Sequence, residues 1–408
     1  MSGYRKARAL VRARSWLACG VLVLGFPTAC IASTSATSCV AADPIVLGDV
    51  SSLSGSLRFP ESQQAAKLAF DAVNARCGIN GHLVDYEVLD DGGEPAKALA
   101  LTRELVLQRG AVALIGGTSV VGCGANADFY RSTPVASIPG TGTGPRCFDS
   151  PNISPPNSGL FSLTTLALKF AAEHLSPKKI CLLGNAHPAI PGNFRDPVER
   201  FHRMSGRSVT IINEELHPDS DPQLALGQLE AAGCDVAFVG TLAQFAGHIA
   251  TELGRSSNRD LRLILAPEAY TQAFLSQLNP TLSGQVFVVT DTDFLDSKRP
   301  GMTRVRTLLS KGGVELSPFA AGGALAAHIV VDAISTIHGP INRQSVLSAL
   351  LRIGPYDTEG LTASAYKFAW PENRRLPAGI HVVVFENGVW AHATETWIVL
   401  EQPDFAWH

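Results

Sequence analysis

The sequence predicts an α/β protein built from two doubly wound lobes, each a parallel sheet with helices on both faces. Apolar strand-like segments alternate with helix-length segments, and this alternation restarts after a loop-rich stretch near the middle of the chain. The length of 408 residues also exceeds what one ordinary hydrophobic core organises. Because crossovers between parallel strands are right-handed, we expect each sheet to be covered on both sides.

The first alternation follows a basic and apolar N-terminus. After an apolar strand, small and apolar residues recur at helical spacing until Gly78 ends the helix. A half-buried alternating strand follows, and Pro95 opens a further helix. The expected strands of this unit are Ile45–Val50, His82–Asp90, Ala111–Ile115 and Val135–Ile138.

The second alternation begins at Ile180, after a stretch from Gly140 to Gly159 that is rich in Gly, Pro, Ser and Asn. Residues 320–337 indicate a long buried helix, and the turn at Asn387-Gly388 predicts a return to β structure near Val382–Phe385. The expected strands of the second unit are Ile180–Leu183, Val209–Asn213, Val236–Val239, Leu261–Leu265 and Val286–Thr290.

Residues 1–42 are typical of a signal peptide. Five basic residues precede the apolar run Trp16–Phe26, and small residues lead to a cleavage-like Val40-Ala41-Ala42. The apolar run is about half the ~20 residues that a membrane-spanning helix needs. We therefore expect export to the periplasm; acylation of Cys30, which follows small residues, is the alternative.

The charge balance disfavours a nucleic-acid partner. Beyond residue 42 the chain holds 28 Lys and Arg against 36 Asp and Glu, whereas nucleic-acid binding needs a basic face.

Five cysteines follow the leader, and the pair Cys123 and Cys147 is the predicted disulfide. Each lies just beyond a predicted strand, and neighbouring parallel strands would bring those two loops together. An odd count implies one free thiol. The alternative is that all five are small buried apolar residues.

Ligands of doubly wound sheets bind beyond the carboxyl ends of the strands. The loops there are rich in Gly, Ser, Thr and Asn, which offer N–H groups and hydroxyls to a small polar solute, although such residues also make ordinary turns. The loops concerned are 51–60, 116–123, 140–145, 184–193, 240–244, 267–270 and 290–293.

Four segments resemble one known family, the leucine/isoleucine/valine-binding type of periplasmic solute receptor that serves ABC importers. The resemblance runs in order from about residue 45 to 390 and is most specific near the start. It rests on Ile45-Val-Leu-Gly-Asp-Val-Ser-Ser-Leu-Ser-Gly55, Ala72-Val-Asn-Ala-Arg-Cys-Gly-Ile-Asn-Gly81, the pair Asp90-Asp91 before the Pro95 helix, and Ala113-Leu-Ile-Gly-Gly117.

The resemblance implies a type I periplasmic-binding-protein fold, in which two lobes joined by a three-crossing hinge close on a solute. Lobe 1 would hold residues 43–164 and 290–383, and lobe 2 would hold 165–289 and 384–408. The implied partners are a small-molecule solute and an ABC permease in the inner membrane, and the implied state is a monomer.

The resemblance also implies roles for individual residues. Thr143 matches a threonine that grips a ligand carboxylate, with Ser119 and Thr141 beside it, and Glu268 matches the acid that receives an amino group. Asn185 and Thr241 are further candidates on lobe 2. The alternatives are a turn hydroxyl for Thr143, an exposed acid for Glu268, and strand-end caps for Asn185 and Thr241.

The chain departs from the family where Val120-Val121-Gly122 replaces a run of serines. Aromatic contacts are replaced by Leu57 or Arg58 in the first loop and by Leu242 and Ala243 in a later one. The expected solute is thus an amino acid, an amide or a less polar carboxylic acid, with Arg58 either assisting a carboxylate or simply solvated.

No motif specifies catalysis, a cofactor or a metal. Gly122-Cys-Gly124-Ala-Asn-Ala127 formally matches a dinucleotide fingerprint, but it does not lie in the first strand–helix unit. The chain has no Gly-x-Ser-x-Gly or His-Glu-x-x-His motif. A solute receptor is the first hypothesis; a secreted nucleotide-cofactor enzyme and a ligand-sensing module are the alternatives.

Overall fold

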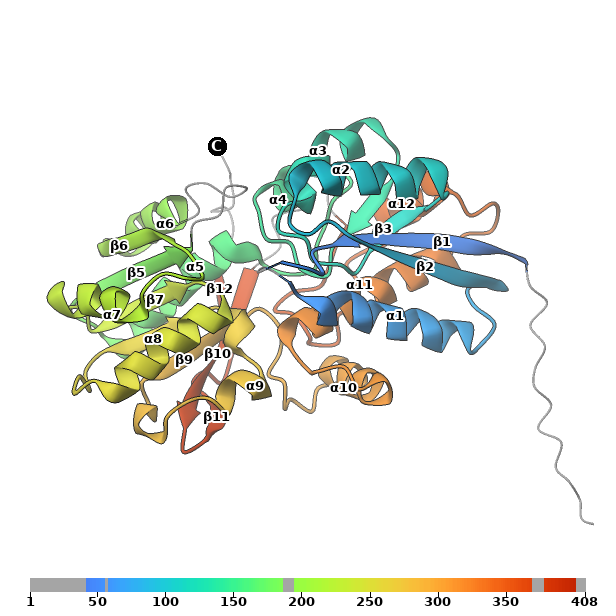
Figure 1. Cartoon of the computed structure of the whole chain (residues 1–408). Coiled ribbons are helices and arrows are strands. Elements are labelled where there is room, and N and C mark those ends of the chain that lie inside the picture. Colours follow the sequence, from blue (N-terminus) through green and yellow to red (C-terminus); the bar gives the residue numbers. More distant parts are fainter. Residues whose placement is uncertain (1–41, 56–57, 186–193, 369–377, 401–408) are drawn as a thin grey trace, which may run out of the picture. The chain divides into compact units, whose positions relative to one another are not determined.

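The computed structural model describes residues 42–55, 58–185, 194–368 and 378–400, which belong to one compact unit. Two sheets with their covering helices make up this unit (Figure 1), and we call them the first and the second lobe. The expected leader cleavage site lies at the boundary of the described residues, because the first strand begins at Ala42.

The sheet of the first lobe is parallel and has the strand order β2-β1-β3-β4. All four of its predicted strands are confirmed, with β3 and β4 shorter than expected. The bounds are β1 Ala42–Ser51, β2 His82–Asp90, β3 Ala113–Ile115 and β4 Ala136–Ile138.

Helices from three parts of the chain cover this first sheet. Four of them begin at a proline that directly follows their N-cap residue, a position where the missing N–H costs nothing. Their bounds are α1 Pro60–Asn74, α2 Pro95–Arg103, α3 Gly122–Ser132, α4 Arg146–Asp149, α10 Pro300–Gly312, α11 Pro318–Ser335 and α12 Arg343–Arg352.

The sheet of the second lobe has the order β11-β10-β9-β8-β7-β5-β6, with β12 also paired to β10. It is parallel from β6 to β9, and β10 runs antiparallel to β9, β11 and β12. The bounds are β5 Ile180–Asn185, β6 Val209–Leu216, β7 Val236–Gly240, β8 Arg262–Leu265, β9 Val286–Thr290, β10 Ala378–Glu386, β11 Val389–His392 and β12 Ile398–Leu400.

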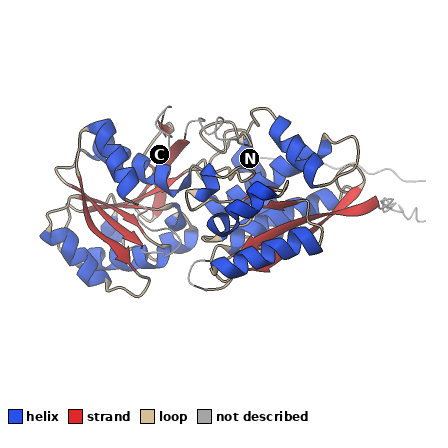
Figure 2. Cartoon of the chain, turned by 90° about the horizontal axis from the view of Figure 1, so that it is seen from above, coloured by secondary structure: helices blue, strands red, loops and turns tan. Residues whose placement is uncertain are grey.

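The second sheet is doubly wound as predicted (Figure 2). Successive residues of β8 belong to different hydrophobic clusters, Leu263 and Leu265 to one and Ile264 to the other, because strand side chains alternate between faces. Its helices are α5 Gly159–Phe170, α6 Arg195–Ser205, α7 Pro222–Ala231, α8 Ala243–Arg255 and α9 Gln272–Leu275.

The chain passes between the lobes three times. It leaves the first sheet after β4, returns to the first lobe with α10 after β9, and re-enters the second sheet at β10. Strand β10 lies in the second sheet, although residues 378–383 were assigned to lobe 1. The remaining domain boundaries stay a prediction.

Helix α11 is the long buried helix expected near residues 320–337. It is apolar and long enough to cross a membrane, but 78% of its 18 residues are buried inside the protein. Its side chains join those of α1 and the first sheet in one hydrophobic cluster. It is therefore a core helix, which Ser317 caps by accepting the N–H of Ala320.

Candidate functional site

A pocket lies beyond the carboxyl ends of β4, β8 and β9, where doubly wound sheets bind their ligands. It encloses about 690 Å³ of space, including its opening to solvent. Residues of both lobes line it: Gly140, Thr141, Gly142, Thr143, Pro156, Asn157, Gly159, Leu160, Leu163, Pro267, Glu268, Asp291, Thr292, Pro318, Phe319, Ala321, Gly322, Leu325, Leu361 and Thr362.

Glu268 is the acid that the sequence singled out, and it lines this pocket. A short 3-10 turn after β8, Pro267–Ala269, carries it. Its Oε2 atom is enclosed and has no hydrogen-bond partner. Burial, with a smaller contribution from the negative charges of Asp291 and Glu61, raises the pKa of Glu268 to about 7. The Oε2 atom therefore lacks a donor or a cation, although the backbone N–H of Glu268 itself donates to the carboxylate.

Asp291 is a second carboxylate in the pocket, directly after β9. It is 7% exposed, and its Oδ2 accepts the backbone N–H of Ser158 at 3.0 Å. Burial raises its pKa, while hydrogen bonds from the backbone N–H groups of Ser158 and Asp291 itself, and from Asn157, act in the opposite direction. Asp291 thus already holds donors from other residues, whereas the Oε2 atom of Glu268 has none.

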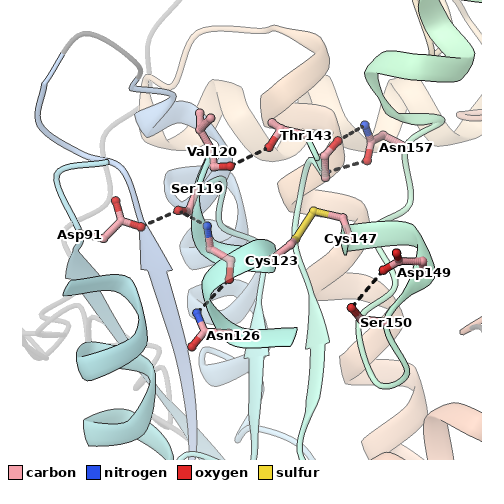
Figure 3. The surroundings of a disulfide bond; sticks show 12 residues. Asp91, Ser119, Val120, Cys123, Asn126, Thr143, Cys147, Asp149, Ser150 and Asn157 are labelled. Carbon is pink, nitrogen blue, oxygen red and sulfur yellow. Dashed lines mark hydrogen bonds between the residues drawn. A yellow bond between two sulfur atoms is a disulfide. The ribbon is translucent and has the colours of Figure 1, made fainter. Parts of the chain in front are cut away.

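Thr141 and Thr143, both predicted, line the pocket from the loop after β4. Asn157 holds this loop, because its Oδ1 accepts the N–H of Gly142 at 2.7 Å and its Nδ2 donates to the Gly142 carbonyl at 3.0 Å. The Thr143 hydroxyl donates to the carbonyl of Val120 at 3.4 Å (Figure 3). Of the two predicted threonines, Thr143 is therefore already hydrogen-bonded within the protein.

Ser119 does not line this pocket. Its hydroxyl donates to Asp91 at 2.5 Å and accepts the N–H of Gly122 at 2.9 Å (Figure 3). It lines a separate cavity that also contains Asp49 and Asn126. The structure thus separates Ser119 from the other lobe 1 candidates.

The other candidates also lie apart from the lining residues. Thr241 is 6% exposed and donates to the carbonyl of Leu242 at 3.5 Å, and Asn185 ends β5 as a partly buried residue. Arg58 is exposed and does not line the pocket. Leu57 lies outside the described residues.

Sequence reasoning missed three kinds of lining residue. Asp291 directly follows a predicted strand, in a loop that strand-end reasoning marks, but no motif distinguishes it. Asn157 belongs to the loop-rich stretch, whose contacts sequence does not give. Phe319 and Leu325 come from α11, which reaches the pocket only through packing of the first lobe.

Cys123 and Cys147, the pair expected from sequence, form a disulfide with a Cα–Cα distance of 5.0 Å (Figure 3). It joins α3 to α4 just after the Thr141–Thr143 loop. A second disulfide, Cys181–Cys234, was not foreseen and lies within the second lobe. Cys77 is disulfide-bonded as well, so the expectation of a free thiol among these five cysteines is wrong.

A family model described as "Periplasmic binding protein" matches residues 44–388 of the chain. The chain belongs to this family. This match confirms the resemblance that the sequence shows to periplasmic solute receptors. No curated protein matches it.

Solved structures of low sequence identity share the fold of this binding protein. A branched-chain amino acid ABC transporter from Thermus thermophilus with bound valine has a TM-score of 0.74 at 17% identity, covering 90% of this chain and 98% of that one. A branched-chain amino acid transporter substrate-binding protein from Streptococcus pneumoniae in complex with isoleucine has 0.71 at 20%, covering 88% and 100%.

A fatty acid ABC transporter substrate-binding protein from Thermomonospora curvata matches with a TM-score of 0.70 at 18% identity, covering 89% of this chain and 93% of that one. Two of these structures hold a bound amino acid, and the third is named for fatty acid transport. The fold therefore does not select the ligand, and the residues of the pocket must.

Proposed function

We propose that this protein is the solute-binding component of an ABC importer, working outside the cytoplasm and delivering a small organic solute to a membrane permease. The family and the neighbours named as substrate-binding proteins support binding without chemical turnover. A basic and apolar leader supports export. We expect a monomer, which light scattering after size-exclusion chromatography tests.

One observation carries the proposal: a pocket with apolar walls ends at a carboxylate whose enclosed oxygen has no donor. The walls are leucines, prolines and Phe319, and the carboxylate is Glu268. A buried acceptor without a partner costs free energy that a donor from a ligand recovers. An ammonium group attached to an apolar body supplies both the donor and the charge.

Ligand binding would favour lobe closure, because the pocket is lined from both lobes. Thr141 and Phe319 come from the first lobe, while Leu160 and Glu268 come from the second. A solute that contacts both sides binds the closed state better than the open state and shifts the population toward it.

The proposal is tested with Glu268→Gln, which keeps the shape of the side chain and removes its charge. A library of amines, amino acids, amides and carboxylic acids is first screened by thermal shift, since a ligand that binds the folded state raises Tm. We expect the variant to bind the selected amine at least tenfold more weakly by calorimetry, through loss of a charge-assisted contact.

Glu395→Gln, at an exposed acid, is the matched control and should keep wild-type affinity. A library in which no solute raises Tm would reject the solute-binding function. An unchanged affinity in Glu268→Gln would show that Glu268 does not bind an ammonium group of the ligand.

The pKa of about 7 for Glu268 predicts a pH-dependent affinity. An ammonium ligand needs the ionised carboxylate, so at pH values below 7 the free protein must lose a proton before it binds. We expect the affinity to fall as pH drops from 8 to 6 and to change little above 8. Calorimetry in buffers of different ionisation enthalpy should detect proton release at pH 6, and uptake of protons would contradict the assignment.

A further inference from the structure

The pocket is anionic. Among its lining residues, all within the described ranges, Glu268 and Asp291 are carboxylates and none is Lys, Arg or His. Glu61 adds a third negative charge close enough to act on Glu268. The other lining side chains are apolar or neutral. A ligand with a net negative charge would enter this pocket against repulsion, while a cation would be attracted.

The two carboxylates differ in their hydrogen-bond donors. Asp291 accepts a hydrogen bond from the Ser158 N–H, which supports its ionised form without neutralising its charge. Glu268 has an enclosed oxygen without a donor. An ammonium group bonded to Glu268 would also lie in the field of Asp291, since each carboxylate is close enough to the other for their charges to interact.

Of the three residues expected to hold a carboxylate, Ser119 and Thr143 are already engaged, while Thr141 lines the pocket. The Ser119 hydroxyl donates to Asp91 outside the pocket, the Thr143 hydroxyl donates to the Val120 carbonyl, and the Gly142 N–H donates to Asn157. A ligand carboxylate would have to displace one of these bonds or rely on the Thr141 hydroxyl next to two acids. Both outcomes cost affinity.

Building on the proposed function, we propose that the pocket selects a net cation, namely a primary amine with a branched aliphatic or aromatic body whose carboxylate is absent or present as an amide. Asp291 is the specificity-determining residue. It supplies the second negative charge that penalises a zwitterion, while Glu268 receives the ammonium group.

Two matched ligand series test the preference by calorimetry at pH 8. The aliphatic series is leucine, leucinamide, 3-methylbutylamine and 4-methylpentanoate; the aromatic series is phenylalanine, phenylalaninamide, phenethylamine and 3-phenylpropanoate. In at least one series, we expect the amide and the amine to bind at least tenfold more tightly than the amino acid, and the acid not to bind.

An amino acid that binds as tightly as its amide, or binding of either acid, overturns the inference while leaving the solute-binding function intact. If no member of either series binds, the inference is overturned as well. The solute-binding function itself falls only if the wider library also leaves Tm unchanged, so the two failures are distinguishable.

Asp291→Asn tests the assigned residue, because asparagine keeps an acceptor for the Ser158 N–H and loses the charge. We expect the ratio of amide affinity to amino acid affinity to fall at least fivefold. A purely structural role at the start of α5 would weaken all ligands alike and leave this ratio unchanged, which would overturn the assignment. Asp260→Asn, at an exposed acid, is the control and should leave the ratio at its wild-type value.

Discussion

At the scale of single residues, two buried aspartates hold the loops at the carboxyl edge of the first sheet. Asp49 is 5% exposed and accepts the Ser51 hydroxyl at 2.5 Å, and a Cβ on Gly117 would lie 1.8 Å from its Oδ1. Asp91 accepts the hydroxyls of Ser52 and Ser119. This network explains why Ser119 serves the scaffold and not the ligand pocket.

Asp49 predicts a pH-dependent stability. Burial raises its pKa from 3.8 to about 7, so between these values the folded state keeps a proton that the unfolded state releases. The contribution of protonated Asp49 to the free energy of unfolding is therefore fully present below pH 4 and is lost as pH rises toward 7. Asp49→Asn has no group that titrates at this position, so we expect the variant to lack this loss. Between pH 5 and 8 the free energy of unfolding of wild type should fall by about 2–3 kcal/mol more than that of the variant.

Urea unfolding at pH 5 and 8 measures this difference. Asp85→Asn, at an exposed position of β2, provides the control and should track wild type. Parallel pH profiles for wild type and Asp49→Asn would show that the carboxyl group is not protonated in the folded state.

At the scale of elements, α11 approaches α1 and the Thr141–Thr143 loop without side chains between the backbones. A Cβ on Gly322 would lie 2.2 Å from the Gly140 carbonyl oxygen, and one on Gly323 would lie 2.0 Å from that of Ser62. Because backbone atoms stand in the way, neither position has room for a side chain. The helix thereby positions both Phe319 and the loop at the pocket.

Two helix glycines form a matched pair for this argument. Gly323→Ala should destabilise the protein by about 1–3 kcal/mol, because the methyl group forces α11 away from α1. Gly227→Ala, in α7 with open space around the added methyl group, should stabilise by about 0.5–1 kcal/mol through helix propensity. Denaturant midpoints measure both changes, and a neutral Gly323→Ala would contradict the close approach.

At the scale of the whole molecule, the lobes are connected by hydrogen bonds between the crossing segments. Ser158 belongs to the first crossing; its N–H donates to Asp291 of the second, and its hydroxyl donates to the Gly379 carbonyl of the third at 3.4 Å. The disulfides Cys123–Cys147 and Cys181–Cys234 each lie within one lobe. Neither of these two disulfides therefore restrains the lobes against each other.

We expect ligand to reduce the radius of gyration of the oxidised protein in solution scattering, because closure needs no disulfide to break. A ligand at 100 times its Kd should also add about 2.7 kcal/mol to the free energy of unfolding. Ser158→Ala keeps the N–H that binds Asp291 and serves as a mild hinge control. Tight binding with an unchanged radius of gyration would count against closure.

The amino-acid sequence by itself determined the strands, the two alternating units and three loops that line the pocket, 140–145, 267–270 and 290–293, because these depend on local periodicity and on the rule for parallel sheets. It also placed Thr141, Thr143 and Glu268 at the pocket through family resemblance. These features depend on order along the chain, which the sequence states directly.

Only the tertiary structure decided which polar groups are still available. Ser119 has the right position in the sequence, but its proton is engaged by Asp91, and Asp291 reaches the pocket only because β9 ends beside β8. The antiparallel β10 and the Cys181–Cys234 pair are likewise contacts between distant segments. Each donor forms its hydrogen bond with one of several candidate acceptors, and tertiary packing, which no local sequence pattern gives, decides which acceptor that is.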